Sequence, residues 1–401
     1  MVVTIPRCLL ACAAALGIAA GAAAADLREG FAAAGALSPR LQALAAERSV
    51  LLARRERSEA LTPGAPFVLA GYRSDRLPGD RGLREYEGEV GLPLWLPGET
   101  RALRAAAVAQ LAALDAAVAR ERLLLAGEVR AGWWAWQDAV AARRAAQGRV
   151  AQARALERDL GRQVAGGLAP EADRLAVAAA LREAETALRI AERAVRQEAV
   201  AFRALTGRLP SDGPAEAEAA PPGEGADPRI AAARAAEAAG RAAEGLVRLR
   251  DRANPEVVLQ FRHERDARGE PWGSRLAVLF TIPLGHPPLQ RERLAAAQAV
   301  TTAGTAAALA SARAVAGGIA LARENRDAAG AVLHAAGQRQ AALAEQAALY
   351  EAGWRAGELP LIEVIRVRTA LAEAEAARLR ARVALGRAGS ALNHAFGVEP
   401  R

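Results

Sequence analysis

One long stretch of this sequence occurs twice, and this duplication limits the folds open to the chain more than any other feature. The first copy, residues 164–207, reads VAGGLAPEADRLAVAAALREAETALRIAERAVRQEAVAFRALTG. The second copy, residues 350–397, reads YEAGWRAGELPLIEVIRVRTALAEAEAARLRARVALGRAGSALNHAFG. Gly167 aligns with Gly357 at an offset of 190 residues, and a Pro follows each of them three positions later. We therefore expect two copies of one long structural unit.

Each copy predicts a hairpin of two helices. The Gly residues break a helical stretch, and a helix begins again at Pro170 or Pro360, because Pro suits the first helical position, where an N–H group has no intrahelical partner. Beyond Pro360, apolar and small side chains recur at alternating spacings of three and four residues, which is the heptad pattern of closely packed helices. These positions are Ile362, Ile365, Thr369, Ala372, Ala376, Leu379 and Val383.

The helical stretch before each turn is very long, near 100 Å at about 1.5 Å per residue. Each return helix measures roughly 55 Å, and a short helix near the start of each copy adds roughly 35–40 Å. One return helix and one short helix therefore match one long helix, which predicts two long helices that each pack against a stacked pair. The predicted ranges are about 97–164 and 288–352 for the long helices, 170–206 and 360–395 for the return helices, and short helices beginning near Pro39 and Asp227.

Each copy also predicts a hairpin of strands, about eight residues long, ahead of its long helix. Apolar and polar residues alternate with a period of two, as in strands with one apolar face. In the second copy Val257, Leu259 and Phe261 share one face, opposite Gln260 and Arg262. The four runs lie within residues 66–73, 85–95, 255–264 and 274–284.

These patterns predict a mainly α fold with a small β part. Its core feature is a pair of duplicated, coiled-coil helical hairpins, and each chain adds four β-strands. We expect a leader over residues 1–25, a first repeat over 26–207 and a second repeat over 227–401. The segment between the repeats, residues 208–226, is rich in Pro, Gly and Ala and is expected to be a linker rather than a helix.

Composition agrees with long helices better than with a thick globular core. The chain is 52% hydrophobic but only 4% aromatic, and much of the apolar share is Ala, which favours helices and fills little volume. The net charge of +8 comes from Arg, because the sequence contains no Lys. Since the Arg residues alternate with Glu and Asp along the helices, they indicate solvated helix faces, and no nucleic-acid partner is expected.

The N-terminus is typical of a secretory leader. It carries one basic residue, Arg7, then an apolar run, then a row of Ala residues before Asp26, which predicts cleavage between Ala25 and Asp26. Cys8 and Cys12 both lie in this leader, so the mature chain would have no disulfide and no thiolate site. Lipidation of Cys12 stays open as an alternative. No later stretch offers about 20 apolar residues free of charge, so no transmembrane helix is expected.

Four amphipathic strands cannot close a membrane barrel, which takes about eight strands at least. An open four-stranded sheet would also leave edges that lipid cannot satisfy. If these strands meet lipid, several chains must share one barrel, and closed cyclic symmetry is the usual arrangement. The alternative is a soluble strand hairpin added to a coiled-coil protein.

The whole mature chain resembles the TolC-like outer-membrane efflux family. The resemblance rests on the duplicated plan of a strand hairpin followed by a long helix, on the Pro-Leu exits at Pro93 and Pro283, and on the Gly-x-x-Pro turns followed by Asp173 and Glu363. The second turn, AGELPLIEVI, is most similar to the heavy-metal, CzcC-like branch. Short strands, few aromatic residues for interfacial girdles and the polar sequence APEADRL depart from the family pattern.

The resemblance implies a homotrimer with a twelve-stranded barrel in outer-membrane lipid and an α-helical tunnel, or α-barrel, through the periplasm. Its partners would be a periplasmic adaptor (membrane fusion) protein and an inner-membrane pump. The protein would act as a passive, gated exit duct of a tripartite efflux system. The cargo would be heavy-metal cations, with drugs or secreted polypeptides as alternatives.

The helical turns are the candidate contact sites for the adaptor. An acidic residue follows each turn at equivalent repeat positions, Asp173 and Glu363, and these two are candidates for an acidic gate that selects cations. The alternative is that both acids only favour the positive end of a helix dipole. The residues of the turns are Gly166, Gly167, Leu168, Pro170, Gly357, Glu358, Leu359 and Pro360.

No catalytic residues and no cofactor are predicted, because no carboxylate pair has a recognisable catalytic arrangement and the Gly residues form no phosphate loop. No metal site is predicted either, since the four His residues have no paired ligand spacing. The cluster of Trp133, Trp134 and Trp136 is interpreted as packing anchors within the first long helix. The rivals to a duct are a periplasmic coiled-coil adaptor, which usually carries one helical hairpin and several β domains, and an envelope scaffold protein.

Overall fold

The computed structural model describes residues 24–77, 79–167, 170–214, 216–221, 223 and 227–400. Most of the predicted leader, with Cys8 and Cys12, and the turn residue Leu168 lie outside the described residues. Contacts divide the chain into two compact units, Met1–Leu37 with Ala131–Pro214 and Ser38–Arg130 with Ala215–Arg401. Helix α3 (Glu99–Ala165) begins in the second unit and ends in the first.

In the first unit a short helix packs near the end of a return helix. Gly30 in α1 lies so close to the ring of Phe202 in α4 that an added Cβ would stand 2.6 Å from it. Phe202 is fully buried, and Gly207 ends α4 in the left-handed conformation with a φ of 71°. The sequence analysis did not find α1 or the two-residue strands. The elements are β1 (Ala24–Ala25), α1 (Leu27–Leu37), the end of α3, α4 (Glu171–Thr206) and β4 (Leu209–Pro210).

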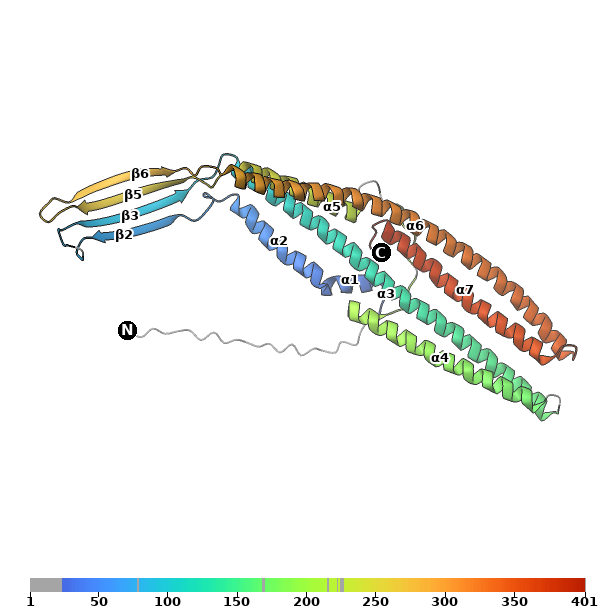
Figure 1. Ribbon diagram of the computed structural model, residues 1–401. Helices are drawn as coiled ribbons and strands as arrows, with labels where there is room; N and C mark the ends of the chain where they lie inside the picture. Colours follow the sequence, from blue (N-terminus) through green and yellow to red (C-terminus); the bar gives the residue numbers. More distant parts are fainter. Residues whose placement is uncertain are drawn as a thin grey trace, which may run out of the picture. The chain divides into compact units, whose positions relative to one another are not determined.

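In the second unit the long helix α6 packs against α5 along its first part and against α7 along its second part (Figure 1). The α5 contact includes a hydrogen bond from Thr305 to Glu237 of 2.7 Å, and the α7 contact includes an Arg368–Glu351 pair of 2.8 Å. This is the predicted stacking of a short and a return helix against one long helix. The helices of this unit are α2 (Pro39–Arg57), the start of α3, α5 (Pro228–Leu249), α6 (Pro287–Arg355) and α7 (Leu361–Ala395).

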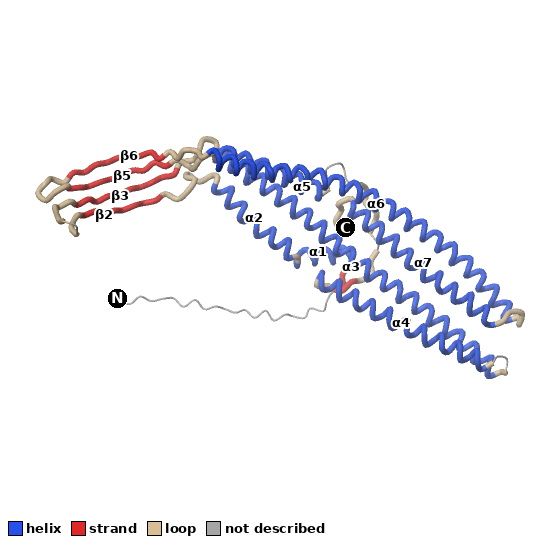
Figure 2. The backbone as a smooth tube through the Cα atoms, in the orientation of Figure 1, coloured by secondary structure: helices blue, strands red, loops and turns tan. Residues whose placement is uncertain are grey.

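The strands form one four-stranded antiparallel sheet in the order β2-β3-β5-β6, so the hairpins of the two halves lie side by side. They join through β3 and β5, whose register runs from Arg84 opposite Arg265 to Pro93 opposite Glu256. Among the described residues, no helix covers either face of this sheet (Figure 2). The strands are β2 (Phe67–Ser74), β3 (Arg84–Pro93), β5 (Glu256–Arg265) and β6 (Gly273–Thr281).

The structure confirms the mainly α fold class and the predicted helices to within a few residues. Two details differ. Pro170 and Pro360 are not first helical residues but N-cap residues with extended backbone, ψ being 148° and 147°, so each helix begins one residue later. Three of the strands hold 9 or 10 residues rather than about eight, because pairing continues past the apolar core of each run.

Two helices, α3 and α6, contain a stretch long and apolar enough to cross a membrane by length and composition alone. The sequence analysis did not expect them, because it required about 20 apolar residues free of charge. Both helices are rich in Ala and contain 67 and 69 residues. A membrane helix needs only about 20 residues to span a hydrocarbon core of roughly 30 Å.

Candidate functional site: the two faces of the sheet and the helical turns

One face of the sheet is a continuous exposed apolar surface. The register places Val90 of β3 between Val68 of β2 and Leu259 of β5, and Leu259 stands opposite Val278 of β6. Such a patch on an uncovered sheet marks a surface for lipid or for another protein. This face, which we call the apolar face, exposes Val68, Val90, Leu259, Phe261, Leu276, Val278 and Phe280 by 47–78%.

The opposite face is polar and internally connected, and we call it the polar face. Glu87 accepts hydrogen bonds from Gln260 at 2.5 Å and from Arg262 at 3.0 Å. Glu85 forms ion pairs of 2.9 Å with both Arg73 and Arg262. Because these residues come from β2, β3 and β5, the network ties three strands together across the junction of the two halves. The sheet therefore has one face suited to lipid and one suited to water.

Aromatic rings gather at the loop end of the apolar face, and we call them the aromatic row. Tyr72 and Tyr86 lie opposite each other with ring centroids 5.0 Å apart, and Tyr86 lies 5.9 Å from Trp272. The ring of His263 stacks on Trp272 at 4.6 Å with an angle of 8° between the planes. The sequence analysis found too few aromatic residues for a girdle. The register nevertheless brings the four rings of the aromatic row, from four different segments, to the same height on the sheet.

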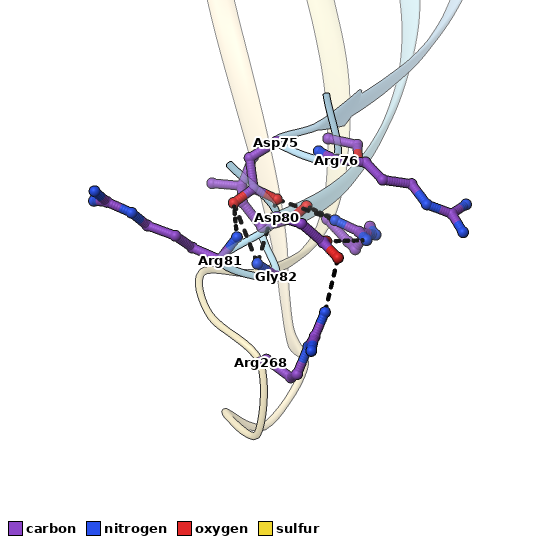
Figure 3. Close-up of polar contacts among 9 residues, drawn as sticks. Asp75, Arg76, Asp80, Arg81, Gly82 and Arg268 are labelled. Carbon is purple, nitrogen blue, oxygen red and sulfur yellow. Dashed lines mark hydrogen bonds and ion pairs between the residues drawn. The ribbon is translucent and has the colours of Figure 1, made fainter. Parts of the chain in front are cut away.

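The two loops at this end of the sheet are cross-linked (Figure 3). Asp75 accepts hydrogen bonds from the backbone N–H groups of Arg81 and Gly82 at 2.7 and 3.2 Å. Asp80 binds Arg268 of the other loop at 2.8 Å, and the backbone N–H of Arg268 donates to the Arg81 carbonyl at 2.9 Å. Gly82 has a φ of 104°, and an added Cβ would lie 2.4 Å from the Arg268 nitrogen. These contacts hold the loops of the two halves together.

Electrostatics stabilises the same loops. The hydrogen bond from Arg84, together with the charge of Arg268, holds the pKa of Asp80 below its usual range. Arg84 bridges Asp75 and Asp80 at 3.1 and 3.0 Å. The cluster is therefore charged at neutral pH and compensated within itself.

At the other end of the sheet a buried carboxylate joins strands to helices. Glu99, the first residue of α3, accepts hydrogen bonds from Arg250 at 2.7 Å, from Asn254 at 2.6 Å and from the backbone N–H of Leu96 at 3.1 Å. Arg250 ends α5, and Asn254 leads into β5, so Glu99 links the first half of the chain to the second. No local sequence signal predicts this role, because an acidic residue at a helix start is also explained by the helix dipole.

The linker is held in place by buried polar contacts in the second unit. Glu216 receives two hydrogen bonds from Arg130, of 2.9 and 2.8 Å, and both side chains are buried. Asn393 of α7 donates to the Ala217 carbonyl at 2.9 Å and accepts from the backbone N–H of Ala219 at 2.8 Å. The described part of the linker contains no helix.

His394 lies in the same region of α7. Burial, and next the charge of Arg130, lower the pKa of His394 to about 4. Its ring lies against Gly127, where an added Cβ would stand 2.9 Å from the imidazole. The side chain is therefore neutral at physiological pH and acts as a packing group rather than as a cation.

The two helical turns share one backbone feature at their Gly residues. In the first, Gly167 has a φ of 71° and donates to the Val164 carbonyl at 3.0 Å. In the second, Gly357 has a φ of 78° and donates to the Trp354 carbonyl at 3.0 Å. Leu359 packs over Gly353, where an added Cβ would approach its side chain to 2.9 Å. Each turn needs a Gly in the left-handed conformation, which a side chain would strain.

The acidic gate candidates occupy equivalent positions in the first turn of each return helix. The backbone N–H of Asp173 donates to the Pro170 carbonyl at 3.1 Å, and that of Glu363 donates to the Pro360 carbonyl at 3.2 Å. Both side chains are partly exposed, and Glu363 forms an ion pair of 2.6 Å with Arg366. The two residues belong to different compact units.

The three Trp residues of α3 are packing residues, as interpreted from the sequence. All three are buried, and Trp133 meets Trp134 edge to face at 4.8 Å. The indole N–H of Trp133 donates to the Ser211 carbonyl at 3.3 Å, which ties the helix to the segment that follows β4.

The sequence matches no protein-family model and no curated protein sequence. Several solved structures share the architecture over nearly the whole chain, among them the following three. The outer membrane protein VceC of Vibrio cholerae is 16% identical with a TM-score of 0.74, covering 93% of this chain and 96% of that one. CusC, whose structures concern transmembrane channel formation, is 14% identical with a TM-score of 0.76, covering 94% and 93%. The MtrE outer membrane channel of Neisseria gonorrhoeae is 17% identical with a TM-score of 0.71, covering 93% and 89%.

The chain has the fold of an outer-membrane channel. The resemblance drawn from the duplicated sequence is thereby confirmed for the fold, from the four-stranded sheet to the long helical hairpins. The sequence analysis placed the apolar and polar faces of the strands correctly. It missed Glu99 and the aromatic row. A signal for that row exists, because Trp272 continues the even-numbered positions that carry the apolar residues of β6.

Proposed function

We propose that three copies of this chain form the outer-membrane duct of a tripartite efflux system. The observation that carries the proposal is the sheet, which in the described part of the chain has two unpaired edge strands, β2 and β6, and no helix over either face. Unpaired strand edges cannot be satisfied in lipid. Pairing β6 of one copy with β2 of the next removes every edge, and three copies give a closed barrel of twelve strands.

The strand lengths support this arrangement. A strand of 10 residues, such as β3 or β5, extends about 34 Å at 3.4 Å per residue. Tilted by about 40°, it spans roughly 26 Å, which matches the apolar band of about 25 Å on outer-membrane barrels. In this barrel the apolar face meets lipid and the polar face lines the lumen.

The charge of the polar face supports a duct for cations. The register assigns five Glu and three Arg side chains to this face in each chain. The lumen is therefore electronegative, and it favours cations, as rings of carboxylates do in other channels. The residues are Glu85, Glu87, Glu89, Glu256, Glu264, Arg73, Arg262 and Arg275.

The helical part supplies the rest of the proposed duct. The repeats of residues 26–207 and 227–401 contribute equal numbers of long helices to a periplasmic tunnel, with the linker of residues 208–226 between them. The turns at Gly167 and Gly357 would contact a periplasmic adaptor, which connects the duct to an inner-membrane pump. Export would be passive through the duct, with Asp173 and Glu363 as gate residues, and the pump would supply the energy.

Heavy-metal cations are the proposed cargo. This rests on the electronegative polar face and on the resemblance of the second turn to the heavy-metal branch. Drugs and secreted polypeptides are the competing cargoes. The reversal potential of single channels in a salt gradient measures cation selectivity and so separates metal cations from these cargoes in part. A duct that discriminates against cations contradicts the metal proposal without affecting the trimer.

The decisive experiment is the mass of the detergent-extracted protein, with planar-bilayer conductance measured on the same preparation. A trimer with discrete conductance steps is expected. Substituting Val278 of β6 by Pro removes an N–H of the edge strand on the side away from β5 and should abolish the trimer and the conductance together, because Pro cannot donate in a strand ladder. Recovery of the wild-type chain as a soluble monomer or dimer without conductance would contradict the proposal and favour a periplasmic adaptor or envelope scaffold.

A further inference from the structure

Two Arg residues stand above the aromatic row at the loop end of the apolar face. Arg84 of β3 and Arg265 of β5 are direct partners in the register, two positions before Tyr86 and two positions after His263. Side chains two positions apart lie on the same face of a strand. Arg84 and Arg265 therefore point from the apolar face, not from the polar face with Arg262.

These two cations differ in their partners. Arg84 is bound by Asp75 and Asp80. Arg265 has no carboxylate partner among the described residues, and its buried Nε atom has no hydrogen-bond partner among them. Its guanidinium lies over the Trp272 ring at 5.2 Å from the centroid. A partly buried cation stacked on an aromatic ring keeps its donors free for an anion from outside.

The support for Trp272 is rigid. The His263 ring stacks on the Trp272 ring at 4.6 Å, and its Nδ1 atom lies 2.9 Å from the Ser274 hydroxyl. Tyr86 contacts the same indole from β3. Arg265 is thus held at the level where an apolar band of side chains gives way to polar loops, which is the level of lipid headgroups around a membrane barrel.

We propose that Arg265 and Trp272 form a binding site for the phosphate of an anionic membrane lipid. The lipid lies in the leaflet on the side of the loops, with its acyl chains along Phe261 and Leu276 and its phosphate on the Arg265 guanidinium. Charge complementarity favours this occupant, since Arg binds phosphate through a fixed fork of N–H donors. The inference rests on the proposed function, because it requires the apolar face to meet lipid.

The test counts lipids bound to the detergent-purified trimer by native mass spectrometry. The probes are phosphatidylglycerol and phosphatidylcholine with the same acyl chains. A basic residue near an anionic membrane surface changes affinity by roughly fivefold. Arg265→Gln should therefore weaken phosphatidylglycerol binding by about fivefold and leave phosphatidylcholine binding unchanged. Trp272→Leu, which keeps an apolar side chain but removes the stacking surface, should weaken it in the same direction.

Arg81→Gln is the matched control, because it removes the same charge from the same end of the sheet. The Arg81 side chain points away from the polar cluster of the loops (Figure 3). An equal loss in Arg81→Gln would overturn the site, since it would show attraction by net charge alone. Competition by inorganic phosphate as strong as that by the lipid would overturn the lipid as the occupant.

The same preparation separates this inference from the proposed function. If the wild-type chain forms no conducting trimer, the proposed function fails and the lipid site fails with it. If the trimer conducts and Arg265→Gln binds phosphatidylglycerol as tightly as the wild type, the lipid site alone is wrong. Conductance of the Arg265→Gln and Trp272→Leu trimers verifies that each variant is assembled.

Discussion

The carboxylate of Glu99 and the guanidinium of Arg250 are joined by a hydrogen bond of 2.7 Å at the point where the strands give way to the helices. Glu99 is fully buried, and Asn254 donates a further hydrogen bond to it. A buried carboxylate is tolerated only when its oxygens are paired, because its desolvation is costly. The contact therefore fixes the start of α3 to the segment between α5 and β5.

Glu99→Ala is expected to destabilise the protein by roughly 3 kcal/mol, because it leaves Arg250 and Asn254 without their partner. Thermal unfolding of the detergent-extracted protein measures the change. Glu128→Ala is the control, since Glu128 is half exposed and meets Arg40 only at 3.7 Å. Similar shifts in the two variants would contradict the clamp.

The contact between Arg130 and Glu216 is expected to stabilise the position of the linker. A double-mutant cycle with Arg130→Ala and Glu216→Ala should give a coupling of about 2 kcal/mol, because both side chains are buried and share two hydrogen bonds. The neighbouring pair Arg326–Glu218 is exposed and should give under about 1 kcal/mol. Equal coupling in the two cycles would show that burial of the linker contact has no energetic role.

We expect His394 to make the folded protein less stable in weak acid. Its pKa is about 4 in the folded chain against 6.5 in the absence of the fold, because burial and Arg130 oppose its charge. Between these values the unfolded chain binds a proton that the folded chain does not, so stability is full above pH 6.5 and falls as the pH drops toward 4. The loss amounts to at most roughly 3 kcal/mol.

Unfolding measured across this pH range checks the His394 prediction. His394→Gln should flatten the dependence, since the side chain no longer titrates. His334→Gln, which changes an exposed His of α6, should leave the slope as it is. A slope that survives in His394→Gln would assign the acid sensitivity to other groups.

Asp173 and Glu363 remain candidates for an acidic gate in the proposed duct. The double variant Asp173→Ala with Glu363→Ala is expected to raise the leak conductance of the reconstituted channel. Glu171→Ala is the control, because Glu171 lies in the same helix turn as Asp173 but corresponds to Leu361, not to an acid, in the second repeat. Unchanged leak in the double variant would contradict the gate. The role of both acids would then be limited to their interaction with the helix dipoles.

A chain cleaved at the predicted leader is expected to begin at Ala24 rather than at Asp26. Ala24 and Ala25 pair with Leu209 and Pro210, and the Ala25 carbonyl accepts a hydrogen bond from the Ser211 N–H at 2.9 Å. Cleavage after Ala25 would remove this strand. Cleavage between Ala23 and Ala24 keeps it and still satisfies the small-residue rule. Mass spectrometry of the N-terminal peptide decides between the two, and a peptide beginning with Asp26 would contradict the expectation.

Sequence reasoning was strongest where the determinants are local. The helix ends follow from Gly207 and Gly357, whose positive φ is a property of the residue itself. The two faces of each strand follow from alternation over a few residues, as at Val257 to Arg262. Such patterns survive without knowledge of the partner segment, which explains why the fold class was predictable.

The missed features depend on contacts between distant residues. Gln260 and Glu89 are 171 positions apart, and no local pattern reveals that β3 and β5 pair. Glu99 looks like any acidic residue at a helix start until Arg250, 151 positions away, is placed beside it. Trp272 lies ahead of the predicted strand and of β6, which begins at Gly273, so its place in the aromatic row shows only through its contacts with Tyr86 and His263. The functional assignment of the turns stays a prediction for the same reason, since its partners are other molecules.

The pairing of β3 with β5 has a consequence for symmetry in the proposed trimer. The ring would contain six hairpins in a pseudo-sixfold order, yet only a threefold axis relates identical ones. Hairpins bearing Glu85, Glu87 and Glu89 alternate with hairpins bearing Arg262 and Arg275. A single substitution is thus repeated at every second hairpin. The duplicated chain can therefore vary the two kinds of hairpin in the barrel wall independently. A sixfold assembly of half-length chains could not do this, because all its hairpins would be identical.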